Sequence, residues 1–381
     1  MTVPGEVLPR YGRASLAEVL PAALGALGER VPPSEVVLPP VRAAAVLLVD
    51  GLGAELLRDH AADAPFLASL PNAGPLTVGF PSSTSISLTS LGTGLPPGAH
   101  GMVGISFRAD GELLDSLKWT RHAGDGADLR EQLVPERVQA APTVLERAEA
   151  AGIGVTVVSQ RVFRGSGLTR AALRGGRFRG TWALGDLAAG VLGALDGPGR
   201  RLCYGYHADL DGLGHVHGPG SLPWRLQLAQ VDRLVSLLVE NLPPGSLLAV
   251  TGDHGMVSVD RRYDADTDPD LRRGVLMLGG DARARHVYAR PGAADDVLAA
   301  WRAVLGDDAA VVPGGQAVAD GWFGPVAPSL ASRIGDVVVA ARGSAAVVRS
   351  EAEPEISKLP GQHGSLSTAE QLVPLKVAVS G

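Results

Sequence analysis

Short apolar runs alternate along the chain with longer segments in which apolar positions recur at helical spacing. The apolar runs predict buried strands at residues 44–49, 153–159, 201–206 and 247–251. The segments between them predict helices at residues 15–27, 54–60, 143–151 and 222–241. Because strands alternate with helices, we expect an α/β fold with a doubly wound, mainly parallel sheet and helices on both of its faces.

The regularity of this alternation divides the chain into parts. Residues 1–40 predict a Pro-rich N-terminal lead-in around a short amphipathic helix, and residues 41–381 predict the α/β domain. Within that domain, residues 260–355 are less regular and predict a smaller inserted cap region. The elements expected in this region are two strands and a helix, near residues 286–289, 335–341 and 293–305.

The composition is that of a folded protein with a sizeable core. Hydrophobic residues make up 45% of the 381 residues, and the 50 Gly and 28 Pro are spread along the chain without a long low-complexity tract. The net charge of -6 argues against a nucleic-acid polymer as the main partner. Small anionic substrates remain compatible with it, since a bound metal ion can reverse the local field.

Three features favour a cytoplasmic location. Cys203 is the only cysteine, so neither a disulfide framework nor a cysteine zinc site is expected, and a reducing compartment fits. The N-terminal segment lacks the basic start and apolar core of a secretory signal. The aliphatic stretch at residues 43–49 is too short to span a bilayer. We expect no membrane partner, and the sequence does not predict the oligomeric state.

Six side chains of metal-ligand type lie in four separate places, each at the end of an apolar run. They are Asp50, the pair Asp211 and His215, the pair Asp253 and His254, and His363. Doubly wound sheets bind their ligands at the carboxyl ends of the strands, where several of these residues are expected. Aspartate and histidine together suit zinc, although manganese or iron can occupy such sites. The pattern therefore indicates a two-metal site for phosphate transfer.

A Ser/Thr-rich segment at residues 82–93 offers a nucleophile. Thr84 is expected at the start of a helix, where exposed backbone N–H groups and the helix dipole favour a phosphorylated intermediate. The alternative is that Thr84 belongs to an ordinary helix N-cap and that the other Ser and Thr residues of the segment have no catalytic role. Ser83 and Ser85 are alternative nucleophiles in the same segment.

Several competing motifs are missing from the sequence. A dinucleotide-binding fingerprint would begin at Gly51 and Gly53, but Leu56 stands in place of its third glycine. No Gly-x-Ser-x-Gly elbow occurs, and no Lys follows a Gly as a P-loop requires. Cys203 does not begin the Cys-x-Pro-x-Arg motif of typical sulfatases.

The chain resembles the alkaline phosphatase superfamily, and most closely its nucleotide pyrophosphatase/phosphodiesterase branch, over residues 44–364. The resemblance rests on five segments in order: VDGLG, FPSSTSISLTSLGTG, DGLGH followed by GP, GDHGM and GQHG. It implies two zinc ions. One would be held by Asp50, Thr84, Asp253 and His254. The other would be held by Asp211, His215 and His363.

The resemblance also implies an activity: hydrolysis of a phosphodiester or phosphoanhydride bond in a small phosphorylated substrate through a phospho-threonine at Thr84. Ser87 stands where this branch commonly has an asparagine that binds a non-bridging phosphate oxygen. Ser87 and the backbone N–H of Thr84 are therefore our candidates for stabilising that oxygen. His100 lies in a segment that resembles a structural loop of the family.

Other activities remain open at this stage. A phosphomonoesterase or phosphonate hydrolase would use the same scaffold, and a phosphomutase or a metal-binding scaffold without turnover fits less well. An apolar or aromatic pocket would favour diesters, whereas additional cationic groups would favour a dianionic monoester. The aromatic pocket candidates are Trp119, Phe163 and Trp224. The cationic candidates are Arg161 and Arg164.

Overall fold

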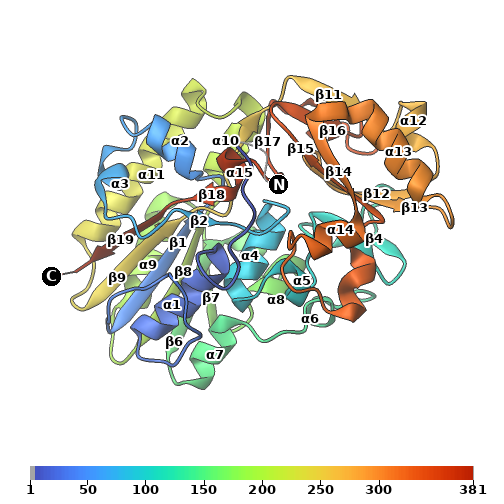
Figure 1. The fold of residues 1–381 in the computed structure, drawn as a ribbon. Helices are drawn as coiled ribbons and strands as arrows, with labels where there is room; N and C mark the ends of the chain where they lie inside the picture. Colours follow the sequence, from blue (N-terminus) through green and yellow to red (C-terminus); the bar gives the residue numbers. More distant parts are fainter. Residues whose placement is uncertain (1–4, 381) are drawn as a thin grey trace.

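The structure is a computed structural model that describes residues 5–380. Its main sheet has six strands in the order β19-β9-β1-β8-β6-β7, and Figure 1 shows the sheet with helices around it. The bounds are β1 Ala43–Val49, β6 Gly154–Gln160, β7 Arg177–Thr181, β8 Arg201–His207, β9 Ser246–Thr251 and β19 Leu375–Val379. Every neighbouring pair is parallel except β19 with β9. The predicted α/β fold with a mainly parallel sheet is confirmed.

The two faces of the central strand β1 pack into separate cores. Ala44, Val46 and Leu48 belong to the core covered by α1 (Val19–Ala26), α4 (Thr84–Thr93) and α7 (Val144–Ala150). Ala45, Leu47 and Val49 belong to the core covered by α9 (Leu184–Leu195) and α11 (Leu222–Glu240). All seven residues of β1 are buried, as expected for a strand with helices on both faces.

The N-terminal segment is part of the main core. Its helix begins as a 3-10 turn at Leu16–Glu18 and continues as α1. The Glu18 carboxylate accepts a hydrogen bond from the Ser15 N–H at 2.7 Å, which caps the start of the helix. Leu16 and Leu20 are fully buried against the sheet core. The expected lead-in therefore supplies core side chains to the α/β unit.

Residues 275–341 build a second, antiparallel sheet in the order β12-β13-β15-β14. Its strands are β12 Val275–Asp281, β13 Ala284–Ala289, β14 Ala309–Pro313 and β15 Val337–Ala341. Helix α13 (Ala294–Leu305) packs on this sheet through Val297, Trp301 and Leu305, which form a core of their own. The orange elements of Figure 1 show this unit beside the main sheet. The division into lead-in, domain and cap stays a prediction.

A buried ion pair connects the second sheet to loops of the main unit. Arg283, in the turn between β12 and β13, donates to both carboxylate oxygens of Glu370 at 2.7 and 2.8 Å, and both side chains are fully buried. Glu370 lies on α15 (Thr368–Gln371), and its backbone carbonyl accepts from the N–H of Gly255 at 2.8 Å. The pair therefore connects the cap sheet to the residue that follows His254.

Replacing Glu370 by Leu should destabilise the protein by about 3–5 kcal/mol, because it leaves the Arg283 charge buried without a partner. The double replacement Arg283→Met with Glu370→Leu should recover most of the loss. Urea unfolding measures each free energy. Glu355→Gln is the control, because Glu355 pairs with Lys358 in solvent and should matter little. A Glu370→Leu loss no larger than that of the control would contradict the expectation.

Across residues 5–380, no helix is both long enough and apolar enough to cross a membrane.

Candidate active site

The four places predicted to supply metal ligands meet at the carboxyl end of the main sheet. Asp50 follows β1 directly, and its N–H donates to the carbonyl of His207 at the end of β8. Asp253 and His254 lie just after β9. The remaining ligand candidates come from α10 (Asp209–His217), which carries Asp211 and His215, and from the residue after β17 (Gly361–Gln362), His363.

The ligand atoms form two groups, each with its atoms within 4.8 Å of one another. One group is Asp50, Asp253 and His254, and the other is Asp211, His215 and His363. The groups adjoin, since the rings of His254 and His363 stack with centroids 3.5 Å apart. This is the division that the family resemblance implies, and the role of each residue as a ligand stays a prediction.

The three histidines all present the same ring nitrogen to the site. Their Nδ1 atoms lie 2.8–3.0 Å from backbone carbonyls, those of Gly361 for His215, Gly255 for His254 and Ser82 for His363. A carbonyl only accepts, so each Nδ1 carries the proton and each Nε2 has a free lone pair.

Two of these lone pairs face each other, because the Nε2 atoms of His215 and His363 are 3.2 Å apart. In this tautomer neither nitrogen can donate to the other. Burial lowers the pKa of His363 well below its ordinary value and keeps this imidazole neutral. A cation at these nitrogens would satisfy both lone pairs.

The three aspartates each keep one buried oxygen without a hydrogen-bond donor among residues 5–380: Asp50 Oδ1, Asp211 Oδ1 and Asp253 Oδ2. Burial, and then the charge of Asp253, raise the pKa of Asp50 well above its usual range. Burial also raises the pKa of Asp253. Buried carboxylates this close together stay ionised only beside positive charge. The unpaired oxygens and the free Nε2 atoms fit two divalent cations.

Thr84 is the hydroxyl residue that faces these groups. It is the first residue of α4, and its Oγ1 lies 3.3 Å from Nε2 of His254. The neighbouring hydroxyls are engaged elsewhere, since Ser83 donates to Asp281 Oδ1 at 2.8 Å and Ser85 donates to the Gly104 carbonyl. The geometry favours Thr84 over Ser83 and Ser85 as the nucleophile.

Ser87 is placed differently from what its expected role requires. Its side chain is fully buried, and its Oγ donates to the backbone carbonyl of Asp253 at 2.6 Å. The single hydroxyl proton is therefore used to hold the loop that carries Asp253 and His254. Contact of Ser87 with a phosphate oxygen stays a prediction, and the described contact favours a positioning role.

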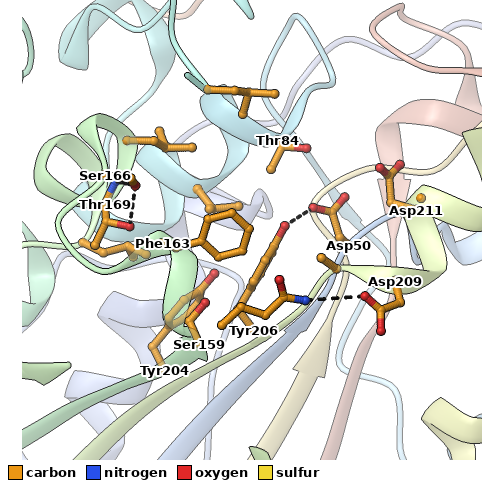
Figure 2. Close-up of a pocket in the computed structure, with 17 residues that line it drawn as sticks. Asp50, Thr84, Ser159, Phe163, Ser166, Thr169, Tyr204, Tyr206, Asp209 and Asp211 are labelled. Atoms are coloured by element: carbon orange, nitrogen blue, oxygen red, sulfur yellow. Dashed lines mark hydrogen bonds between the residues drawn. The ribbon is translucent and has the colours of Figure 1, made fainter. Parts of the chain in front are cut away.

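A cavity of about 410 Å³ opens beside Thr84 and Asp50. Figure 2 shows Phe163 and Tyr206 together in it, and their ring centroids are 5.9 Å apart. The Tyr206 hydroxyl donates to Asp50 Oδ2. No Lys or Arg is among the described residues that line this first cavity. Tyr206 was not predicted as a site residue from the sequence. Its position near the carboxyl end of β8, where ligands bind in such sheets, could have indicated it.

Of the expected pocket residues, only Phe163 lines the first cavity. Trp119 and Trp224 are fully buried core residues. The guanidinium of Arg161 stacks 3.8 Å from the Trp182 ring centroid, and that of Arg164 lies over Phe178, so neither lines the cavity.

His100 has the environment of a structural residue. It is buried, its Nδ1 accepts from the Met102 N–H at 3.1 Å, and its Nε2 contacts the Ser90 hydroxyl at 3.0 Å. Burial lowers the pKa of His100 to about 3, which keeps the ring neutral in this loop.

A family model described as type I phosphodiesterase / nucleotide pyrophosphatase matches residues 44–366, most of the chain. The chain belongs to this family. The resemblance seen in the sequence is thereby confirmed, and membership of this family supports the predicted enzyme, a hydrolase that acts on phosphoric ester bonds. The type I phosphodiesterase match begins within β1 and includes all six predicted ligands and Thr84.

Solved structures share the fold of this type I phosphodiesterase family member. Murine ectonucleotide pyrophosphatase / phosphodiesterase 5 superimposes with a TM-score of 0.68 at 16% identity, covering 88% of both chains. Another structure of the murine protein contains AMP. Phosphonoacetate hydrolase from Sinorhizobium meliloti 1021, in complex with phosphonoacetate, gives a TM-score of 0.66 at 20% identity and covers 89% of this chain and 90% of that one.

Curated relatives match shorter stretches. A phosphopentomutase of Anaeromyxobacter dehalogenans is 31% identical over 158 residues, which are 40% of this chain and 38% of the relative. The catalytic subunit of mouse GPI ethanolamine phosphate transferase 3 is 37% identical over 88 residues, 23% of this chain and 8% of the relative. The alignments thus span well under half of either relative.

Asp50→Asn should raise the melting temperature of the metal-free protein and reduce its stabilisation by added zinc, while the group Asp211, His215 and His363 is left unchanged. The raised pKa means that the folded chain binds this proton more tightly than the unfolded chain. Stability from the protonated form is therefore present at low pH and lost as the pH rises through the raised pKa. The gain from Asn should be larger at about pH 8 than at about pH 5.

Differential scanning calorimetry, with and without zinc, measures these shifts. Asp307→Asn, a replacement at an exposed carboxylate, is the matched control. Equal zinc stabilisation of wild type and Asp50→Asn would exclude Asp50 as a ligand.

Proposed function

We propose that this protein is a metal-dependent phosphodiesterase that acts through a phospho-threonine at Thr84. The observation that carries the proposal is the position of Thr84, which lies beside the first ligand group and opens into an apolar, aromatic cavity. Such a cavity accommodates the second substituent of a diester. A dianionic monoester would instead be favoured by cationic side chains, and the described lining has none.

The donor set supports two zinc ions, since neutral imidazoles and carboxylates without thiolates are typical of catalytic zinc. Asp50, Asp253, His254 and Thr84 would hold one ion, and Asp211, His215 and His363 the other. When bound, these ions supply Lewis-acid stabilisation of the attacking and leaving oxygens of an in-line displacement. The backbone carbonyls of Gly255, Gly361 and Ser82, each in contact with the Nδ1 of one imidazole, keep the three rings oriented for this role.

Thr84 carries the covalent step. Its Oγ1 forms a bond to phosphorus while the bond from phosphorus to the leaving oxygen breaks. The hydroxyl proton passes to solvent, and the leaving oxygen takes a proton from water and departs as the alcohol. The start of α4 directs backbone N–H groups and the positive end of the helix dipole at the same place, which stabilises the transferring phosphoryl group. Water then hydrolyses the phospho-threonine and restores the hydroxyl.

A phosphonate hydrolase is the second candidate. It is favoured by the structural similarity to phosphonoacetate hydrolase, which covers 89% of this chain. The absence of Lys and Arg from the described lining of the first cavity argues against a small anionic substrate there.

A cytoplasmic location is also part of our proposal, and it rests on the single cysteine of the sequence.

Thr84→Ala should abolish turnover, lowering kcat by about three orders of magnitude or more, because the neighbouring Ser83 and Ser85 hydroxyls are engaged elsewhere. The metal content should stay close to that of the wild type, since the six carboxylate and imidazole ligands remain. Thr84→Ser is the matched control and should keep measurable activity. Assays with bis(p-nitrophenyl) phosphate measure turnover, and elemental analysis measures the metal content of each variant. Full activity in Thr84→Ala would overturn the proposed nucleophile.

The zinc-loaded wild type should prefer the diester over p-nitrophenyl phosphate by about a hundredfold in kcat/KM, because only the diester has a second substituent for the first cavity. Steady-state kinetics on both substrates measures this ratio. A preference for the monoester would replace the proposal with a phosphatase, and turnover of phosphonoacetate alone would replace it with a phosphonate hydrolase.

A further inference from the structure

A basic segment builds the edge of the main sheet opposite β19. Residues 150–185 contain six Arg and no Lys, His, Asp or Glu. In a chain whose net charge is -6, this segment concentrates positive charge in one place. Among residues 5–380, carboxylates pair with Arg170, Arg174 and Arg179 of the segment and with none of its other three Arg. Part of this positive charge is therefore available to an anionic partner.

Two large apolar side chains lie in solvent beside these free charges. Val162 is 74% exposed and Trp182 is 78% exposed. They follow the carboxyl ends of β6 and β7, which are parallel neighbours. The guanidinium of Arg161 lies 3.8 Å from the Trp182 ring centroid, and that of Arg164 lies over Phe178. We call Arg161, Val162, Arg164 and Trp182 the rim.

The rim borders the first cavity. Phe163 belongs to the same short segment as the rim residues and lines that cavity, as Figure 2 shows. A small cavity beside Trp182 shares Gln160 and Tyr206 with the first cavity, so the two adjoin. The rim therefore lies at the same end of the sheet as the ligand groups.

The chemistry of the rim fits a lipid surface better than a nucleic acid. An aliphatic side chain such as Val162 gains free energy when it leaves water for lipid, and it offers nothing to a base or a phosphate. A base would need an aromatic face to stack on, but Arg161 already covers one face of Trp182. Tryptophan is enriched where lipid headgroups meet acyl chains, and arginine is attracted to anionic headgroups.

We propose that the rim is a docking surface for a bilayer that contains anionic lipids. Val162 and the Trp182 ring enter the headgroup boundary, and Arg161 and Arg164 contact lipid phosphates. The sequence predicted no membrane partner because it has no spanning segment, but a surface contact needs none. Docking requires no turnover, so the inference goes beyond the proposed function and does not depend on it.

Trp182 provides a direct probe of the contact. The chain has five Trp, and the other four are buried: Trp119, Trp224, Trp301 and Trp322. Phosphatidylglycerol/phosphatidylcholine vesicles with brominated acyl chains should therefore quench part of the tryptophan emission of the wild type. Phosphatidylcholine vesicles alone should quench much less, because they carry no net negative charge. Equal quenching of wild type and Trp182→Phe would overturn the inference.

The double variant Arg161→Gln with Arg164→Gln tests the contribution of charge. Its partition coefficient for the anionic vesicles should fall roughly thirtyfold, which corresponds to about 1 kcal/mol for each Arg. Vesicle sedimentation measures this coefficient. Arg30→Gln with Arg290→Gln is the matched control, because it removes two exposed Arg elsewhere and changes the net charge equally. An equal fall in the control would mean that the net charge alone determines binding, and the proposed surface would then be wrong.

A matched pair of valines tests the apolar part of the rim. Val162→Asp should lower the partition coefficient roughly tenfold, because it replaces an inserting side chain by a carboxylate that the anionic lipids repel. Val37→Asp is the control, since Val37 is 75% exposed and lies outside the rim, and it should bind as the wild type does. Both positions are exposed, so both variants should melt close to the wild-type temperature.

Three further results would contradict the inference. The first is vesicle binding that none of the rim variants weakens. The second is rim-dependent binding of a single-stranded oligonucleotide without vesicle binding, measured by fluorescence anisotropy. The third is rim-dependent self-association without vesicle binding, measured by analytical ultracentrifugation. Thr84→Ala should bind vesicles as the wild type does, so failure of the proposed nucleophile and failure of the docking surface are distinguishable.

Discussion

The main constraint on this structure is the negative charge of three carboxylates at the carboxyl end of its main sheet. Asp50, Asp211 and Asp253 follow three neighbouring strands, and each keeps a buried oxygen without a donor among the described residues. A parallel sheet produces this crowding because its strands all end on the same side. Burial then prevents water from spreading the charge. The carboxylates can remain ionised together only when cations lie among them, so the fold and the chemistry share one requirement.

The residues around the ligands serve the same requirement. Backbone carbonyls fix the tautomer of His215, His254 and His363, and no additional side-chain carboxylate is needed for this purpose. Ser87 holds the carbonyl of Asp253, and the Gly51 N–H donates to the Asp253 carboxylate at 3.0 Å. These contacts orient the ligands through the main chain, which is more rigid than a surface side chain.

The sequence predicted those parts of the site that strand ends determine. Asp50 and Asp253 could be predicted, because an acidic residue just after a continuous apolar run lies at the carboxyl end of a strand in a doubly wound sheet. Trp119 and Trp224 were harder, since an aromatic side chain has no sequence signal that separates a pocket wall from a core position, and both are core. The contact of Asp281 with Ser83 could not be predicted from the sequence, because Asp281 lies at the end of β12 in the second sheet and approaches Ser83 only in the folded chain. Ser87 was recognised as a departure, yet its contact with Asp253 depends on a close approach of α4 to a distant loop.

The antiparallel strand β19 has a consequence for the order of assembly. It covers the outer edge of β9, the strand that leads to Asp253 and His254, and it is the last strand of the described chain. During synthesis, β9 therefore has an open hydrogen-bonding edge until residues 375–379 have left the ribosome. His363 also emerges late, shortly before them. A nascent chain therefore holds Asp50, Asp211 and Asp253 before it can complete either the edge of the sheet or the group of Asp211, His215 and His363.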